Sequence, residues 1–177
     1  MVERLSIFVS ATPVAIAIGS NLGDSKAIVD AAIERLARTP KIRLDAYSHQ
    51  YQTVAVGPPQ PDYINACALL TTTLEPLELL QTLLTIEAQF GRIRRERWGA
   101  RSLDLDLLLY GDVILDLPQL QIPHPRMIDR AFVLVPLAEI APDWIEPVSG
   151  QSIATLAQAV DCSGVHLAQP QPLTPNS

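Results

Sequence analysis

The chain has 177 residues, 48% of them hydrophobic, which supports one domain with a buried core and excludes global disorder. Its 13 basic and 19 acidic residues give a net charge of −6, which argues against a broadly basic nucleic-acid-binding surface. Two cysteines exclude a disulfide-dense scaffold. We expect a single domain over residues 13–160, with a poorly ordered leader at 1–12 and tail at 163–177.

The apolar N-terminal segment has the outline of a secretory signal, which would place the protein outside the cytoplasm. Pro13 and several hydroxyl residues interrupt this segment, and Glu3 offsets the charge of Arg4. It is also too polar to span a bilayer. We therefore expect a first strand behind a short leader, in a cytoplasmic protein with reduced thiols and no membrane partner.

The first part of the chain predicts a strand, a helix and a second strand. Residues 14–18 form a short β-branched apolar run, and turn residues follow it at 19–24. Apolar positions at helical spacing predict an amphipathic helix over 25–38. Strand formers fill 42–56, and three prolines then make 57–62 a stiff loop.

The second part predicts a strand over 63–74, a helix over 76–91 and a strand over 103–110. The resulting order is βαββαβ, which predicts an α+β fold: a ferredoxin-like sandwich with helices on one face of an antiparallel sheet. Further helices at 129–141, disturbed by Pro136, and at 151–160 would be C-terminal helical additions to it.

Two carboxylates in the last predicted strand could form a metal site. Asp104 and Asp106 alternate with leucines, so strand geometry places both carboxylates on one face with Cα atoms roughly 7 Å apart. Mg²⁺ is usually held by one or two carboxylates together with substrate phosphates. The pattern alone is equally compatible with an ordinary solvated strand face.

The loop before this strand is rich in arginine. It holds five of the 13 basic residues: Arg92, Arg94, Arg95, Arg97 and Arg101. Guanidinium groups pair with phosphate oxygens in a bidentate manner, so the loop suits a polyphosphate, although a solvated helix end or a nucleic-acid patch is the alternative. A cationic clamp beside a metal-binding pair is what phosphoryl transfer needs. Neither a P-loop motif nor a dinucleotide motif is present.

A third group of residues could bind a flat organic ring. Tyr63 and Asn65 share one face of their predicted strand, and Phe132 follows the proline-flanked segment 123–126. Aromatic faces can sandwich a heterocycle, and an amide can pair with its edge. A single aromatic is more often a core residue. The histidines and cysteines show no zinc spacing.

These residues together resemble the 6-hydroxymethyl-7,8-dihydropterin pyrophosphokinases of folate biosynthesis. The similar segments run in the family's order from about residue 17 to residue 142: 17–23, 57–65, 91–94, 97–106 and 122–132. The run from Arg97 to Asp106, which reads Arg-Trp-Gly-Ala-Arg-Ser-Leu-Asp-Leu-Asp, is highly specific, whereas Gly-Ser-Asn at 19–21 alone is weak.

The resemblance implies that ATP, as co-substrate, donates its terminal pyrophosphoryl unit to the pterin hydroxymethyl oxygen and that AMP is released. Asp104 and Asp106 would hold two Mg²⁺ ions, and Trp98 would close over the site and exclude water. The catalytic residues would be Arg94, Arg101, Asp104 and Asp106.

The resemblance also implies which residues contact each substrate. ATP would be bound by Glu87, Arg92, Arg94, Arg97, Arg101, Leu107, His124 and Arg130. The pterin would be bound by Thr53, the backbone of Val56, Tyr63, Asn65, Trp98, Asp104 and Phe132. The chain departs from the family at Val54-Ala-Val56, where relatives often have a proline, at the length of the arginine loop and at Ile128.

Two other functions remain to be weighed against a pyrophosphokinase. An RNA-binding module shares the βαββαβ order, but it needs stacking aromatics and a basic face where this chain has paired aspartates. A pterin aldolase needs a base and no triphosphate clamp. We therefore expect only small-molecule substrates as partners, no nucleic acid, and a monomer.

Overall fold

The structure is a computed structural model, and it describes residues 10–55, 57–91 and 102–169. The elements follow in the order β1 (Thr12–Ser20), α1 (Ser25–Ala37), β2 (Ile42–Tyr47), β3 (Tyr51–Thr53), β4 (Tyr63–Thr72), α2 (Pro76–Gln89), β5 (Asp104–Tyr110), β6 (Leu115–Leu117), β7 (Leu120–Ile122), the 3₁₀-helix η1 (Met127–Asp129), α3 (Ala131–Ile140), α4 (Ile153–Ala159) and β8 (Val165–Leu167).

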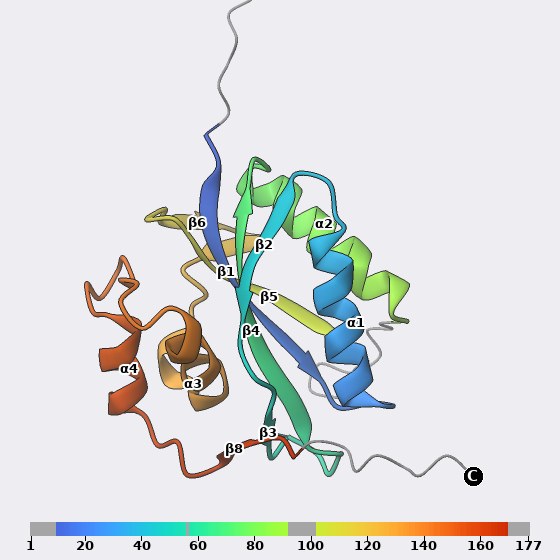
Figure 1. Cartoon of the computed structure of the whole chain (residues 1–177). Helices are drawn as coiled ribbons and strands as arrows, with labels where there is room; N and C mark the ends of the chain where they lie inside the picture. Colours follow the sequence, from blue (N-terminus) through green and yellow to red (C-terminus); the bar gives the residue numbers. More distant parts are fainter. Residues whose placement is uncertain (1–9, 56, 92–101, 170–177) are drawn as a thin grey trace, which may run out of the picture.

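One antiparallel sheet forms the centre of the molecule (Figure 1). Its strand order is β5-β1-β4-β3-β8, and β2 pairs with β4 as well, beyond the end of β3. Strand β1 is therefore central, with β5 on one side and β4 on the other. The strands β6 and β7 form a separate hairpin.

Helices cover both faces of this sheet. Helices α1 and α2 pack on one face, here called the α1 face, where their apolar sides meet alternate residues of β1, β4 and β5 such as Ile16, Leu70 and Leu105. Helices α3 and α4 pack on the opposite face, here called the α3 face, against Ala15, Cys67 and their neighbours (Figure 1). The βαββαβ helices thus share one face, and the C-terminal additions cover part of the other.

The predicted strand over 42–56 is two strands in the structure. Strand β2 ends at Tyr47, and the next residue, Ser48, turns the chain by bonding to Cys67 of β4: its N–H donates to the Cys67 carbonyl at 2.9 Å, and its Oγ accepts the Cys67 N–H at 2.9 Å. The pairing with β4 then resumes at β3. This break places Tyr51 and Thr53 beside the first half of β4.

The C-terminal part also differs in detail from the prediction. The predicted helix over 129–141 is η1 followed by α3, which continues through Pro136. Strand β8 lies within the stretch 163–177, for which we expected no regular structure, and it extends the sheet beside β3. No helix of the described residues has the length and apolar character needed to cross a membrane.

Candidate active site

One row of residues runs across the sheet on the α3 face and joins two of the predicted groups. Gly19 pairs with Asp104 on one side and with Asn65 on the other, and Asn65 pairs in turn with Tyr51. These four residues are here called the Gly19 row. Directly opposed residues of antiparallel strands point to the same face. Because neighbouring strands lie about 4.8 Å apart, the Cα atoms of Asp104 and Asn65 are only about 10 Å apart.

The adjacent row on the same face contains the second carboxylate. Asp106 pairs with Ala17, which pairs with Cys67. Both aspartates are half-buried, while Leu105 and Leu107 between them are buried on the α1 face, as the alternation predicts. The carboxylates therefore lie together at the start of β5, in the Gly19 row and the row next to it, where Gly19 and Asn65 are buried and Asp104 and Tyr51 are half-buried.

The side chains of Asn65 and Tyr63 lie close against Gly19 in the middle of its row. A Cβ at this position would lie 3.0 Å from Oδ1 of Asn65 and 3.6 Å from Cδ1 of Tyr63. The first distance is shorter than normal contacts between such atoms. A glycine is therefore needed for the Asn65 amide and the Tyr63 ring to adopt these positions.

The predicted ring-binding residues of the sheet occur together. Asn65 is 7% exposed and donates from Nδ2 to Oγ1 of Thr53 at 2.7 Å. Thr53 pairs directly with Tyr63, which is half-buried. The hydrogen bond fixes the plane of the amide, so that its edge is presented beside the tyrosine ring.

The proline loop in front of Tyr63 is held by a residue to which we assigned no role. Asn21 is 1% exposed, and its Nδ2 donates to Oε1 of Gln60 at 2.9 Å and to the carbonyl of Pro61 at 3.0 Å. Its position directly after β1 was visible in the Gly-Ser-Asn segment. The function of its amide depends on a loop that lies about 40 residues later in the sequence.

His124 lies close to the carboxylates and carries no charge at neutral pH. Burial, together with the positive charges of Arg130 and Arg126, lowers the pKa of His124 to about 4, against the opposing effect of Asp104. Its Nδ1 accepts the N–H of Arg126 at 3.2 Å. The imidazole proton is therefore on Nε2, which can donate to a phosphate or hydroxyl oxygen.

A cavity of about 660 Å³ opens beside β5 and connects three predicted ATP-site features. Asp106, Leu107 and His124 all line it. The remaining lining residues come from α2, from β5 and from the region of the β6–β7 hairpin: Leu80, Leu105, Asp116, Leu117, Pro118, Gln119, Leu120, Gln121 and Pro125. Its volume lies within the range of sites that bind small organic ligands.

Arg130 and Phe132 lie on either side of the start of α3. The Arg130 guanidinium carbon is 5.5 Å from the centre of the Phe132 ring. Phe132 is half-buried and packs against the apolar residues on the α3 face that surround Cys67. The ring is thus on the same face of the sheet as Tyr63 and Asn65, and the arginine is near His124.

Among the predicted ATP residues that the structure describes, Glu87 has the most enclosed position. It is 2% exposed at the end of α2, and its Oε1 accepts the N–H of Leu105 at 2.7 Å. This bond ties α2 to the start of β5, beside the two aspartates. Val56, Arg92, Arg94, Arg97, Trp98 and Arg101 lie outside the described residues.

The donor set at the start of β5 fits Mg²⁺. Asp104 and Asp106 offer hard carboxylate oxygens on one face, next to a cavity and a neutral imidazole. Mg²⁺ prefers such oxygens and usually completes its coordination with substrate phosphates and water. The carboxylates and the cavity could therefore hold a metal-bound polyphosphate while the Asn65 side of the row holds a ring.

Comparison with known proteins gives a family match over this whole region. Residues 15–142 match the family described as 7,8-dihydro-6-hydroxymethylpterin-pyrophosphokinase (HPPK). The chain is 53% identical over 150 residues to a 2-amino-4-hydroxy-6-hydroxymethyldihydropteridine pyrophosphokinase of Synechocystis sp., covering 85% of this chain and 77% of that one. It is 45% identical over 151 residues to a protein of the same name from Pseudomonas aeruginosa, covering 85% and 93%.

Solved structures show the same fold at low identity. The wild-type Plasmodium falciparum HPPK-DHPS with pteroate superimposes with a TM-score of 0.68 at 13% identity. The match covers 84% of this chain and 42% of the Plasmodium chain, so this chain spans less than half of that protein. At this identity the likeness is evidence of the fold alone.

Proposed function

Because the chain belongs to the 7,8-dihydro-6-hydroxymethylpterin-pyrophosphokinase family, we propose that the Gly19 row is where its two substrates meet. The enzyme transfers pyrophosphate from ATP to hydroxymethyldihydropterin in folate biosynthesis. The observation that carries the proposal is the pairing of one glycine with Asp104 on one side and Asn65 on the other.

The pterin occupies the Asn65 side of the row. Thr53, Asn65 and the Val56 backbone contact the ring edge, Tyr63 and Phe132 stack on its faces, and Trp98 and Asp104 complete the site. Two observations support this assignment for the described residues: the hydrogen bond from Asn65 to Thr53, and the close approach of Asn65 and Tyr63 to Gly19, which has no Cβ. The assignments of Val56 and Trp98 depend on the family resemblance alone.

ATP occupies the Asp106 side and the cavity beside β5. His124 and Arg130 bind its phosphates, and Glu87 and Leu107 form the nucleoside region. Glu87 contributes through its hydrogen bond to the Leu105 N–H at the start of β5. The lining of the cavity by Leu107 and His124 supports this assignment. Arg92, Arg94, Arg97 and Arg101 are assigned to ATP by the family resemblance, with Arg94 and Arg101 also catalytic.

Asp104 and Asp106 would hold the two Mg²⁺ ions that the family resemblance implies. When bound, the metal neutralises phosphate charge as it develops in the transition state. The residues themselves place the substrates in line: the pterin hydroxymethyl oxygen forms a bond to the β-phosphorus and loses its proton to water, the bond from that phosphorus to the α-phosphate oxygen breaks, and AMP leaves. Holding both substrates in this geometry lowers the barrier by removing the cost of bringing them together.

A crossed pair of substitutions tests this division of the site. Asn65→Ala is expected to raise the KM for hydroxymethyldihydropterin about tenfold and to leave the KM for ATP within twofold. His124→Ala is expected to do the reverse. If both variants change both constants equally, the two substrates are not separated along the row as proposed. The assay resolves AMP from ADP, and ADP as product would contradict pyrophosphate transfer.

We also propose a ferredoxin-like core, a cytoplasmic location and a monomeric state for the protein. The strand order β5-β1-β4 followed by β2 and β3, with α1 and α2 on one face, supports a ferredoxin-like core. Two free cysteines, Cys67 and Cys162, are compatible with the reducing cytoplasm. A monomer is our expectation for the assembly, and light scattering coupled to size exclusion measures it.

A further inference from the structure

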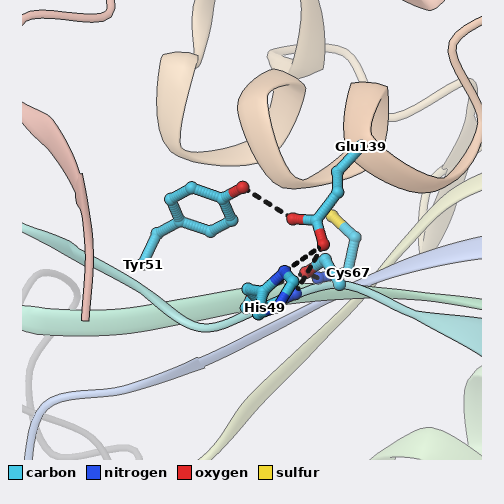
Figure 2. Close-up of polar contacts among 5 residues, drawn as sticks. His49, Tyr51, Cys67 and Glu139 are labelled. Carbon is cyan, nitrogen blue, oxygen red and sulfur yellow. Dashed lines mark hydrogen bonds and ion pairs between the residues drawn. The ribbon is translucent and has the colours of Figure 1, made fainter. Parts of the chain in front are cut away.

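One carboxylate joins helix α3 to the bend between β2 and β3. Glu139, in the last turn of α3, accepts three hydrogen bonds (Figure 2). Its Oε2 accepts the hydroxyl of Tyr51 at 2.6 Å, and its Oε1 accepts the backbone N–H of His49 at 3.0 Å and the ring Nδ1–H of the same histidine at 2.5 Å. These bonds connect residues 88 and 90 positions apart in the sequence.

The contact is continuous with the proposed pterin site at both ends. Tyr51 belongs to the Gly19 row, where it pairs with Asn65, and it is two residues before Thr53 on the same strand face. Glu139 is seven residues after Phe132 in α3, which is about two helical turns, so both side chains project from the same side of the helix. The carboxylate thus joins the strand that carries the ring-edge contacts to the helix that carries a stacking ring.

The rest of the contact between α3 and the sheet is less directional, apart from the weak hydrogen bond that the Cys67 thiol donates to the Val133 carbonyl at 3.5 Å. Val133, Leu134 and Leu137 are buried against Cys67 and neighbouring apolar residues. Apolar packing of this kind stabilises the contact but permits small shifts, whereas hydrogen bonds to a carboxylate have defined lengths and directions. The Glu139 contacts are therefore well suited to set the angle of α3 over the sheet, and with it the position of Phe132.

Glu139 is ionised at neutral pH, as these bonds require. Burial tends to raise the pKa of Glu139, but the hydrogen bonds from Tyr51 and His49 outweigh it and hold the pKa below its ordinary value. The Tyr51 pKa is raised to about 12, by burial first and then by Glu139, so its hydroxyl remains a donor. The Cys67 thiol beneath them is buried, and its pKa is raised chiefly for that reason.

We infer that Glu139, through Tyr51 and His49, is a positioning residue for the pterin substrate. It fixes α3 relative to β3, and so sets the gap between the Phe132 ring and the face formed by Tyr63 and Asn65. This inference rests on the proposed function of those residues as the pterin site. It assigns a role in substrate binding to residues that need not touch either substrate.

Glu139→Ala and Tyr51→Phe test the inference in steady-state kinetics with both substrates varied. Glu139→Ala is expected to raise the KM for hydroxymethyldihydropterin about tenfold, and Tyr51→Phe about threefold. The KM for ATP is expected to stay within twofold, because His124 and the cavity lie on the other side of the row. Glu139→Gln still accepts the Tyr51 hydroxyl and is expected to recover most of the pterin affinity.

Glu146→Ala is the matched control for a purely structural effect. Glu146 is 3% exposed, and its carboxylate accepts the N–H groups of Val148 and Ser149 at 2.8 and 2.7 Å in the loop before α4. Its removal costs hydrogen bonds on the same side of the molecule without affecting the α3–β3 contact. A lower melting temperature with an unchanged pterin KM is the result expected for this variant.

Phe132→Ala separates failure of the inference from failure of the proposed function. If Phe132→Ala raises the pterin KM but Glu139→Ala lowers only the melting temperature, the pterin site is right and Glu139 is merely structural. If Phe132→Ala and Asn65→Ala both leave the pterin KM unchanged, the proposed site itself is wrong. The positioning role would also be overturned if Glu139→Ala and Glu146→Ala raised the KM values for both substrates by the same factor.

Discussion

The two faces of the central sheet are built from alternate residues of the same strands, and each has an apolar core, but the α3 face also carries the polar residues of the Gly19 row. On the α1 face, residues such as Ile64, Ala66 and Leu70 of β4 join a continuous apolar core beneath α1 and α2. On the α3 face, the first half of β4 carries Tyr63, which is half-buried, and Asn65, which is a buried polar residue. Both faces therefore stabilise the fold, and the α3 face also provides the proposed site.

This difference shows how a small domain can hold polar groups in fixed positions. The strands cannot shift in register without moving their apolar residues out of the α1-face core, since a shift of one residue exchanges the two faces. The positions of Asp104, Gly19 and Asn65 are therefore set by the packing of residues they do not contact. Substitutions on the two faces should accordingly separate activity from stability.

The largest effect is expected from Asp104→Asn on the α3 face. Loss of one carboxylate from the proposed Mg²⁺ pair should lower kcat about 10³-fold or more, which corresponds to about 4 kcal/mol of transition-state stabilisation. AMP release with saturating pterin measures it. Asp112→Asn, at an exposed position just after the same strand, should retain full activity. Equal loss in the two variants would contradict a specific role for Asp104.

The opposite pattern is expected from Leu83→Ala on the α1 face. Leu83 is 1% exposed in the core between α2 and the sheet, and truncation of such a leucine costs about 2–5 kcal/mol of unfolding free energy. Urea denaturation measures the loss, while both KM values should remain unchanged for the folded protein. Leu77→Ala in the same helix, where the side chain is 41% exposed, should cost less than about 1 kcal/mol. A change in KM without loss of stability would argue against two independent faces.

The elements that form the α1 face could be predicted because their apolar residues recur periodically in the sequence. Helix α1 spans Ser25–Ala37 where the pattern indicated 25–38, and β5 spans Asp104–Tyr110 where it indicated 103–110. Both elements have apolar residues repeating with the period of their own structure. The strands β6, β7 and β8 have only three residues each, too few for a periodic signal to develop.

A smaller and more selective effect is expected from Gly19→Ala. The added methyl would lie 3.0 Å from Oδ1 of Asn65 and would displace the amide that we assign to the pterin edge. We expect the pterin KM to rise about tenfold, with the KM for ATP within twofold. Gly164→Ala, where nothing lies within 4 Å of the new atom, is the control and should leave both constants unchanged. An unchanged pterin KM in Gly19→Ala would mean that Gly19 is not part of the pterin site.

The proposed site on the α3 face could be predicted only in part from the sequence. The carboxylate pair could be read from one strand, because alternation places Asp104 and Asp106 on one side. The proximity of Asp104 to Asn65 depends on the register of three strands, and the contact between Tyr51 and Glu139 joins residues 88 positions apart. Such cross-strand relationships have no local pattern, so they become visible only when the pairing is known.

A further effect, on acid stability, is expected at His124. Its pKa falls from 6.5 to about 4 on folding, so between these values the unfolded chain binds a proton that the folded protein does not. The wild-type protein should therefore lose stability as the pH falls through this range, with no such contribution above it. His124→Ala should show a shallower decline of the urea midpoint between pH 6.5 and 4. Identical slopes in the two proteins would mean that His124 titrates normally in the folded state.

Paramagnetic relaxation by Mn²⁺, bound in place of Mg²⁺ with a non-hydrolysable ATP analogue, tests the placement of the metal and both substrates. We expect the backbone amide signals of Asp104, Gly19 and Asn65 to broaden together, because these residues occupy one row beside the metal, while Leu36, near the far end of α1, stays sharp. Broadening that leaves Asp104 and Gly19 unaffected, or that is centred on α1, would contradict the placement of both substrates on the α3 face of the sheet.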